Sequence, residues 1–381
     1  MHKIGRYTRL TLLLLSMTTM MSNVAIVTML PHLKNHFTDV ADIEFLSRMM
    51  ITLPSLAIAL LAPFIGHLVY KAGKYISAVA GLVLFSAAGS AGLYLQTIEE
   101  LLISRFLLGI AIGILMIVTT SLIGDYFKGE ARHKYMGIQS LFISMGGVFF
   151  VIGGGYLSDI DWRYPFGIYL IGIVLLPFAI RFLEETGAHK EEDEEVDLNA
   201  NIFKIYLLAF ALMLVFYILP TQMPFLIVNH FGASGTLTGA IIAIAFVSNG
   251  LGALTFARLK KHFSFAAVYI TGMAIISVGF VLIGLVRDVR LFFFTSSIMG
   301  FGGGILMTNI SAWMLSLVHH TKRVKSSGYL TSSLFLGQFF SPIVSHPVVS
   351  YFGVQHFFVV MGVSLGSIVL FAGIYKKLKE R

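Results

Sequence analysis

Apolar residues fill twelve stretches of this chain, and only short polar segments separate one stretch from the next. A helix rises about 1.5 Å per residue, so about 20 apolar residues cross the hydrocarbon layer of a membrane. The pattern predicts spans at residues 8–30, 46–70, 75–95, 100–123, 134–157, 163–183, 202–228, 235–258, 264–286, 290–317, 326–350 and 354–376. Because backbone that faces lipid must satisfy its own hydrogen bonds, we expect every span to be a helix.

Composition points to the same class of protein. The 381 residues are 57% hydrophobic and only 12% charged, and the mean hydropathy is +0.85. Cysteine is absent, which excludes disulfides and thiolate metal sites. The sequence shows no catalytic constellation, nucleotide loop or metal-ligand cluster, so we expect neither an enzyme nor a cofactor or metal. The expected fold class is therefore an all-α membrane protein.

Basic residues are distributed unevenly among the loops. The net charge is +8, and 27 residues are Lys or Arg. If the N-terminus is cytoplasmic, all of these except six lie in the inner loops and tails; the six are Lys34, Arg48, Arg105, Arg163, Arg287 and Arg290. By the positive-inside rule, both termini are predicted to be cytoplasmic, in a multi-pass protein of the inner (plasma) membrane. The charge therefore indicates a lipid bilayer, not nucleic acid, as the partner.

One strongly charged segment, residues 184–201, divides the chain into two halves of six spans each. We expect an N-terminal bundle over 1–183, a cytoplasmic linker over 184–201 and a C-terminal bundle over 202–381. The halves share local sequence: Arg132 and Arg323 precede spans 5 and 11, and they lie 191 residues apart. Gly146 and Gly337 have the same separation, so the halves are predicted to be structural repeats.

Glycines and basic residues form three local motifs. Residues 66–74 read GHLVYKAGK between spans 2 and 3, and residues 105–113 read RFLLGIAIG within span 4. Residues 153–157 read GGGYL at the end of span 5. With the six-plus-six organisation, these motifs resemble those of the major facilitator superfamily, in particular its drug:proton antiporter branch. Two positions depart from the pattern: Tyr70 replaces a loop aspartate, and Phe150-Val151 replaces a Gly-Pro pair in span 5.

The resemblance implies roles for several charged residues. The arginine matching Arg105 faces the cavity in that family and is linked to proton coupling; the alternative is that Arg105 snorkels to the outer surface. On the first view, Arg105→Ala should cut transport and leave melting near wild type. The family also pairs the basic residue matching Lys74 with an acid at the end of span 4, here Asp125. Such a pair, beside Lys71, would hold the inner ends together, whereas the alternative is that these charges only set topology.

Amides within the spans mark the expected interior of the bundle. They are Asn23, Gln139, Gln222, Asn249, Asn309 and Gln338, whereas spans 3, 6, 9 and 12 carry amides only at an edge, Gln96 beside span 3 and Gln355 at the start of span 12. Those four helices stand outside the bundle in the family, and an amide facing lipid costs several kcal/mol. We therefore predict that the amides, with Tyr217 and Trp313, line a central substrate site. Hydrogen bonding between helices without ligand contact is the alternative.

Carboxylates are missing from the middle of the spans, because all 19 Asp and Glu residues lie in loops, tails or at span ends. A buried carboxylate often carries the proton in coupled transporters. Any coupling here must use Asp42 or Glu44, Asp125, or a histidine, and we single out His346, which lies within span 11 and precedes Pro347. The missing acids also favour a neutral or anionic amphipathic substrate.

These observations predict a monomeric secondary active transporter that moves a small amphipathic organic compound by alternating access. The predicted direction is efflux, and protons are the candidate coupling ion. One alternative is an uptake carrier or facilitator for a metabolite or metal chelate. Another is a receptor or lipid-scrambling protein that does not transport.

Overall fold

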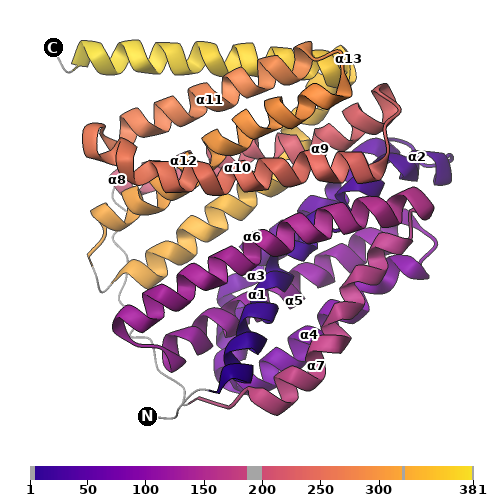
Figure 1. Cartoon of the computed structure of the whole chain (residues 1–381), viewed down its shortest axis with the longest axis vertical. Helices are drawn as coiled ribbons and strands as arrows, with labels where there is room; N and C mark the ends of the chain where they lie inside the picture. The colour runs from indigo at the N-terminus through magenta and orange to yellow at the C-terminus, as the bar shows by residue number, and fades with distance from the viewer. Residues whose placement is uncertain (1–4, 187–199, 320–321, 380–381) are drawn as a thin grey trace. The chain divides into compact units, whose positions relative to one another are not determined.

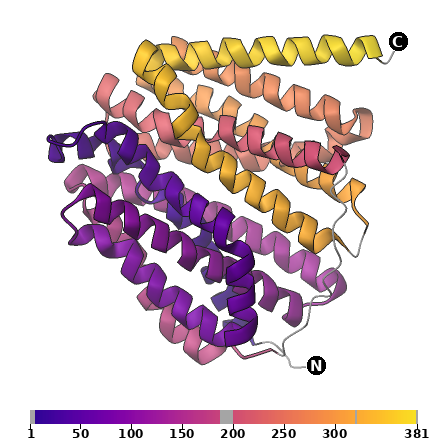
Figure 2. The ribbon, with the colours of Figure 1, turned by 180° about the vertical axis from the view of Figure 1, so that it is seen from behind.

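The computed structural model describes residues 5–186, 200–319 and 322–379, and the secondary structure in these ranges is helical, without strands. Ten helices among them are long and apolar enough to cross a membrane. One of these, within α13 (Arg323–Lys379), contains two crossings, because Gly353 takes φ 72° and ψ 158° and interrupts the helix. Figure 2 shows the two arms of α13 meeting at an angle. The second crossing in α13 is the eleventh, and α1 (Arg6–Val24) is the twelfth. The twelve predicted spans are therefore confirmed.

The contacts divide the chain into unit 1 (Met1–Asp193) and unit 2 (Glu194–Arg381), and both are drawn in Figure 1. Most of the predicted linker, residues 187–199, lies outside the described residues. Unit 1 contains α1, η1 (Val27–His32), α2 (Leu33–His36), α3 (Ile43–Ala72), α4 (Lys74–Ser90), η2 (Ala91–Leu93), α5 (Ile98–Tyr126), α6 (Gly129–Ile160), η3 (Tyr164–Leu170) and α7 (Ile171–Phe182). Unit 2 contains α8 (Ala200–Phe216), α9 (Ile218–Phe225), η4 (Leu226–His230), α10 (Gly235–His262), α11 (Phe265–Leu285), η5 (Val289–Leu291), α12 (Phe292–Leu317) and α13.

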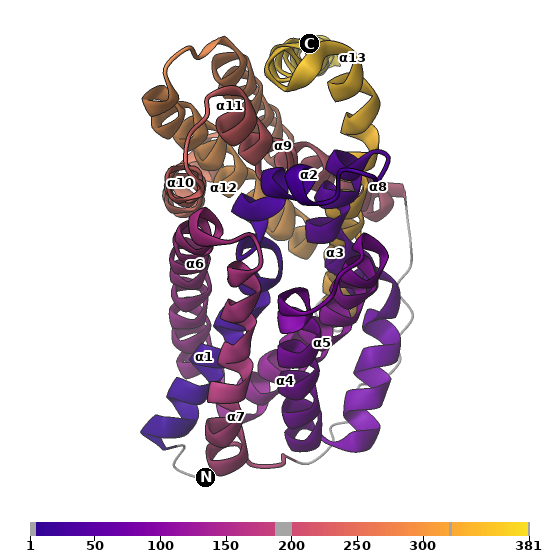
Figure 3. The same cartoon turned by 90° about the vertical axis from the view of Figure 1, so that its right-hand side faces the viewer.

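Helices of unit 1 pack in the pairs α3–α5, α4–α5, α1–α6 and α4–α7, and Figure 3 shows α1 beside α6. Helices of unit 2 pack in the pairs α10–α12, α11–α12, α11–α13 and α8–α13. When the long helices of each unit are taken in chain order, each packed pair of unit 1 has a counterpart in unit 2; for example, α3–α5 corresponds to α10–α12. This agrees with the predicted repeat.

Glycines at matching positions make the same close helix contacts in both units. A Cβ at Gly109 of α5 would lie 2.5 Å from the carbonyl oxygen of Pro54 in α3. A Cβ at Gly300 of α12, 191 residues later, would lie 2.1 Å from the carbonyl oxygen of Ala245 in α10. Pro54 and Ala245 are themselves 191 residues apart. Small residues allow this backbone approach, and the repeated contacts support duplication of one scaffold.

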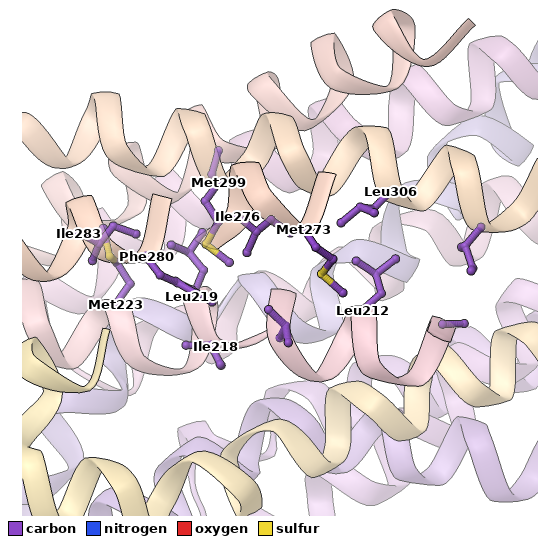
Figure 4. Close-up of a cluster of buried hydrophobic side chains, with 14 of the residues drawn as sticks. Leu212, Ile218, Leu219, Met223, Met273, Ile276, Phe280, Ile283, Met299 and Leu306 are labelled. Carbon is purple, nitrogen blue, oxygen red and sulfur yellow. The ribbon is translucent and has the colours of Figure 1, made fainter. Parts of the chain in front are cut away.

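Apolar side chains hold each unit together, and Figure 4 shows the cluster in unit 2. Leu212 of α8 and Ile218 of α9 lie in it with Phe280 of α11 and Met299 of α12. Each of these four side chains is almost completely buried. The cluster joins α9 to these other helices, so it fixes where α9 lies within unit 2.

The first helix of each unit breaks at a corresponding place. The α-helix of unit 1 ends at Val24 and continues as the 3₁₀ segment η1. In unit 2, α8 ends at Phe216, and α9 is followed by the π-helical turn η4. The two ends are 192 residues apart. Pro220 lacks the backbone N–H that would bond the carbonyl of Phe216, which explains a break there. Paired interruptions of this kind mark binding sites in transporters built from repeats.

Candidate functional site

The break in unit 2 carries a buried polar cluster in which Gln222 of α9 bonds Ser345 of α13, one helical turn after Ser341. Gln222 is 0% exposed, and its Nε2 donates to Ser345 Oγ at 2.9 Å. Its Oε1 has no hydrogen-bond partner, and neither has the Oγ of the fully buried Ser341. His346 follows Ser345 directly in the chain. A buried acceptor without a donor costs about 1–3 kcal/mol, so this cluster is chemically ready to bind a ligand that carries an N–H or O–H group.

One predicted amide lies at the break in unit 1, and a second lies on α6. Asn23 is half-buried at the end of α1, and its Oδ1 is buried without a hydrogen-bond partner. Gln139 of α6 donates through Nε2 to Ser16 Oγ of α1 at 3.0 Å. Asn23 therefore resembles Gln222 in offering a free acceptor, whereas Gln139 bonds one helix to another.

The other predicted substrate-site residues are spread over unit 2. Asn309 of α12 donates through Nδ2 to the carbonyl oxygen of Phe265 at 3.1 Å, and Trp313 stacks on the Phe265 ring at 5.9 Å. Phe265 begins α11, so Asn309 and Trp313 belong to the α11–α12 interface. Gln338 donates to Met213 Sδ at 3.5 Å. Tyr217 is buried where α9 begins, and Asn249 is half-buried on α10. The structure thus brings Gln222 together with Ser345, and Asn309 together with Trp313, as two separate groups.

Arg105 lies inside unit 1, with no exposed surface. Its Nη2 donates to the carbonyl oxygens of Ala88 at 2.9 Å and Gly89 at 2.7 Å, in the last turn of α4. The guanidinium also lies over the rings of Phe166 and Tyr169 in η3, at 4.9 and 5.1 Å from the centroids. A cation is favourable at the C-terminal carbonyls of a helix.

This placement corrects both expectations for Arg105. The side chain neither lines an open cavity nor reaches the outer surface, because it is enclosed by α4, α5 and η3. From this placement we now expect removal of Arg105 to lower the melting temperature, since it would leave a cavity and take a charged donor from two carbonyls. Its role in coupling remains a prediction.

Lys74 and Asp125 form an ion pair at the end of unit 1 where α3 meets α4. The side chain of Lys74 is only 11% exposed and that of Asp125 only 17%. Thr186 joins them, because its Oγ1 accepts from Lys74 Nζ at 3.1 Å and donates to the Asp125 carboxylate. Lys71 is exposed at the end of α3. The pair is therefore less hydrated than an ordinary surface ion pair, and both partners are held in place by a third side chain.

Glu185 caps the helix that Lys74 begins. Its carboxylate accepts from the backbone N–H of Lys74 at 3.0 Å and of Tyr75 at 2.9 Å. Gly73 precedes them with φ +88°, a conformation that favours glycine, and so has no side chain with which to cap α4. Sequence reasoning missed Glu185 and Thr186, because both belong to a charged segment interpreted as solvated linker. Among the described residues, no group of three or more His, Asp or Glu side chains is placed to hold a metal ion.

Comparison with known proteins identifies the class. Residues 12–204 and 205–381 match the family described as Major Facilitator Superfamily. Because these segments cover most of the chain, it belongs to the Major Facilitator Superfamily, as the motifs predicted. Members of this superfamily are membrane transporters, not enzymes.

Relatives with known names include a multidrug transporter, a drug resistance protein and a sugar symporter. The chain is 33% identical to the multidrug transporter protein MdtP of Bacillus subtilis over 126 residues, 32% of this chain and 23% of that protein. It is 31% identical to the quinolone resistance protein NorA of Staphylococcus aureus over 110 residues, 28% of each. It is 27% identical to the arabinose-proton symporter of Escherichia coli over 175 residues, 43% of this chain and 36% of that protein. The matched segments therefore span less than half of each of these relatives.

Solved structures of other transporters share the fold over nearly the whole chain. The nucleoside transporter NupG superimposes with a TM-score of 0.80 at 12% identity, covering 97% of this chain and 99% of that chain. A bacterial homolog of the human lysosomal transporter Spinster, in an inward-facing and occupied conformation, also gives 0.80, at 18% identity and 98% of both chains. At these identities the likeness shows the fold alone, and it confirms the predicted fold class.

Proposed function

We propose that this protein is a secondary active transporter that exports a small amphipathic organic compound by alternating access. The observation that carries the proposal is the pair of helix breaks at corresponding places of the two units, each with a buried amide acceptor lacking a donor: Asn23 Oδ1 and Gln222 Oε1. The similarity to MdtP and NorA supports efflux, because both are named for drug transport or drug resistance. Multi-pass insertion with both termini cytoplasmic, a monomeric state and protons as coupling ion belong to the same proposal.

The substrate class follows from the groups at the breaks. Gln222, Ser341 and Ser345 are neutral, and the acids Glu44 and Asp125 lie at helix ends of unit 1. A site without a carboxylate gives no counter-charge to a permanent cation. It favours a molecule with an apolar body and one or two N–H or O–H donors, which matches the large apolar surface and few polar groups of drug sites.

Counterflow in proteoliposomes tests the proposal without assuming a coupling ion. Norfloxacin, a fluorescent quinolone, is the probe, chosen because one relative is a quinolone resistance protein. We expect saturable exchange, and we expect Gln222→Ala to raise the KM by about tenfold, which is about 1.4 kcal/mol of lost binding. Asn35→Ala, an exposed amide on α2, is the matched control and should not change the KM. Exchange that neither saturates nor responds to Gln222→Ala would contradict the proposal.

Uptake of a metabolite is the second candidate function. Two observations favour it: Phe150-Val151 stands where the antiporter motif has Gly-Pro, and one relative is the arabinose-proton symporter. The same counterflow assay with L-arabinose distinguishes the candidates. Exchange of arabinose without exchange of norfloxacin would favour sugar uptake over efflux of amphipathic compounds as the function.

A further inference from the structure

His32 ends the 3₁₀ segment η1, at the end of unit 1 opposite the Lys74–Asp125 pair. It is a histidine that the sequence pattern did not single out, because it lies just outside the predicted first span. The side chain is half-buried, and its Nε2 is buried without a hydrogen-bond partner. Imidazole is the side chain whose charge changes most readily near neutral pH, so a partly buried histidine with a free ring nitrogen is a candidate proton carrier.

The seam between η1 and α6 brings His32 to an acid. A Cβ at Gly154 of α6 would lie 2.1 Å from the carbonyl oxygen of Ala25, so the two backbones touch there. One turn further along, Ser158 Oγ lies 3.3 Å from Thr28 Oγ1. The next residue of α6 is Asp159, and its carboxylate interacts electrostatically with His32. The chain therefore builds a close-packed seam that ends in an imidazole and a carboxylate.

Other titratable or charged residues at this end of unit 1 lie on the elements that pack against η1. Lys34 and His36 lie on α2, and Glu44 and Arg48 lie on α3. Tyr156 and Asp159 lie on α6, and Asp161 is its C-cap. Glu44 bonds Lys34 at 2.9 Å and Arg48 at 3.5 Å, so its charge is already balanced. The Asp161 carboxylate accepts from the backbone N–H of Arg163 at 2.8 Å. Asp159 is the acid whose charge acts on His32.

The two surroundings of His32 act in opposite directions on its proton affinity. Burial lowers the pKa of the imidazole, and the Asp159 carboxylate raises that pKa in part. The net shift of the pKa is downward, which favours the neutral imidazole in this conformation. Any motion that lets water reach Nε2 removes the effect of burial, which is the larger of the two and lowers the pKa. The attraction of the Asp159 carboxylate then remains, so the proton affinity of His32 rises. Opening and closing of this seam would thus take up and release one proton.

We propose that His32 and Asp159 form a proton-binding pair at the end of unit 1 opposite the Lys74–Asp125 pair, with His32 Nε2 as the proton acceptor and Asp159 as its counter-charge. The proton moves from water to Nε2 when the seam is hydrated and returns to water when the seam closes. This inference rests on the proposed transport function for its use in coupling, but proton binding itself does not.

Histidine NMR tests proton binding on substrate-free protein in nanodiscs. The ring signals of His32 and His36 are assigned by their loss in His32→Gln and His36→Gln, and His36 is the exposed control on the neighbouring helix. We expect His32 to titrate below the ordinary value of about 6.5, and to titrate lower still in Asp159→Asn. An ordinary titration of His32 that is unchanged in Asp159→Asn would overturn the pairing.

Transport in proteoliposomes tests the use of the pair. Norfloxacin movement is measured with a pH gradient and, separately, as counterflow without one. We expect His32→Gln and Asp159→Asn to reduce gradient-driven movement at least tenfold while counterflow and the His36→Gln control stay near wild type. Undiminished gradient-driven movement in both variants would overturn the coupling role. If wild type moves no norfloxacin in either mode, the proposed function fails instead, and the NMR result still decides proton binding.

Discussion

Arg105 and Ser296 occupy matching positions of the two units, 191 residues apart and each four residues before a glycine that touches a neighbouring helix. In unit 1 the guanidinium bonds the last turn of α4. In unit 2 the Ser296 hydroxyl is buried without a hydrogen-bond partner, and Phe280 stands at the position that matches Gly89. The same scaffold therefore encloses a charged guanidinium in unit 1, and a hydroxyl and a phenyl ring at the matching positions of unit 2.

The ends of the units where α4 and α11 begin differ in the same way. Lys74 and Asp125 pair in unit 1, whereas the residue matching Lys74 is Phe265, which stacks on Trp313. Ser264 caps α11 with its own hydroxyl, whereas α4 takes its cap from Glu185. We propose a division of roles in which ionic groups of unit 1 serve coupling and gating, and neutral groups at the helix breaks, Gln222 of unit 2 foremost, bind the substrate.

Removing Arg105 should produce the largest effect. Arg105→Ala should lower stability by about 3–5 kcal/mol, because it leaves a cavity and two carbonyls without their charged donor. Ser296→Ala should change stability by no more than about 0.5 kcal/mol, since its hydroxyl bonds nothing among the described residues. Melting in dodecyl maltoside measures both. Equal melting shifts would mean that the two positions are alike after all.

Alanine at the next matched glycines should have a smaller and unequal effect. A Cβ at Gly304 would lie 1.8 Å from the carbonyl oxygen of Asn249, and backbone cannot easily move away. A Cβ at Gly113 would lie 2.8 Å from Ile65 Cδ1, the end of a flexible side chain. We expect a loss of about 3 kcal/mol for Gly304→Ala and about 1 kcal/mol for Gly113→Ala. A Gly113→Ala variant that melts as low as Gly304→Ala would refute this difference.

The Lys74–Asp125 pair should respond to salt, and its counterpart should not. Lys74→Ala is expected to cost about 1–3 kcal/mol, between exposed and fully buried ion pairs. This cost should shrink in 1 M NaCl, where the screening length is about 3 Å. Phe265→Ala removes a ring that stacks on Trp313, so its cost should persist. Melting of both variants at low and high salt provides the measurement, and a salt-independent Lys74→Ala cost would argue against an ionic contact.

The two helix caps should give the smallest effects. Glu185→Ala and Ser264→Ala should each cost about 1 kcal/mol and loosen only the first turn of α4 or α11, respectively. Hydrogen exchange at the amides of residues 74–77 and 265–268 reports this locally. Unchanged protection of residues 74–77 in Glu185→Ala would show that the linker does not hold α4.

Sequence could predict the scaffold, because hydropathy and glycine spacing act along the chain. The twelve spans followed from hydropathy, and the pairing of Lys74 with Asp125 was implied by the resemblance of the loop motif to the family. The 191-residue repeat followed from Gly146 and Gly337. These features depend on what is near in sequence or repeated at a fixed interval.

Sequence could not predict which way a polar side chain within a span points. Arg105 bonds the end of α4, and Asn309 bonds the carbonyl of Phe265, because tertiary packing brings those carbonyls near. His32 lies outside the predicted spans, so its approach to Asp159 depends on how η1 meets α6. The cap that Glu185 provides could not be predicted for a different reason. A charged segment has no periodicity that would indicate a capping contact.

Proteoliposome kinetics across pH test the proposed division of roles most directly. Norfloxacin transport is measured from pH 5.5 to 8.5 for wild type, Gln222→Ala and His32→Gln. The account predicts that Gln222→Ala raises the KM about tenfold and keeps the wild-type pH profile, whereas His32→Gln keeps the KM and flattens the profile. A flattened profile in Gln222→Ala together with a raised KM in His32→Gln would contradict it.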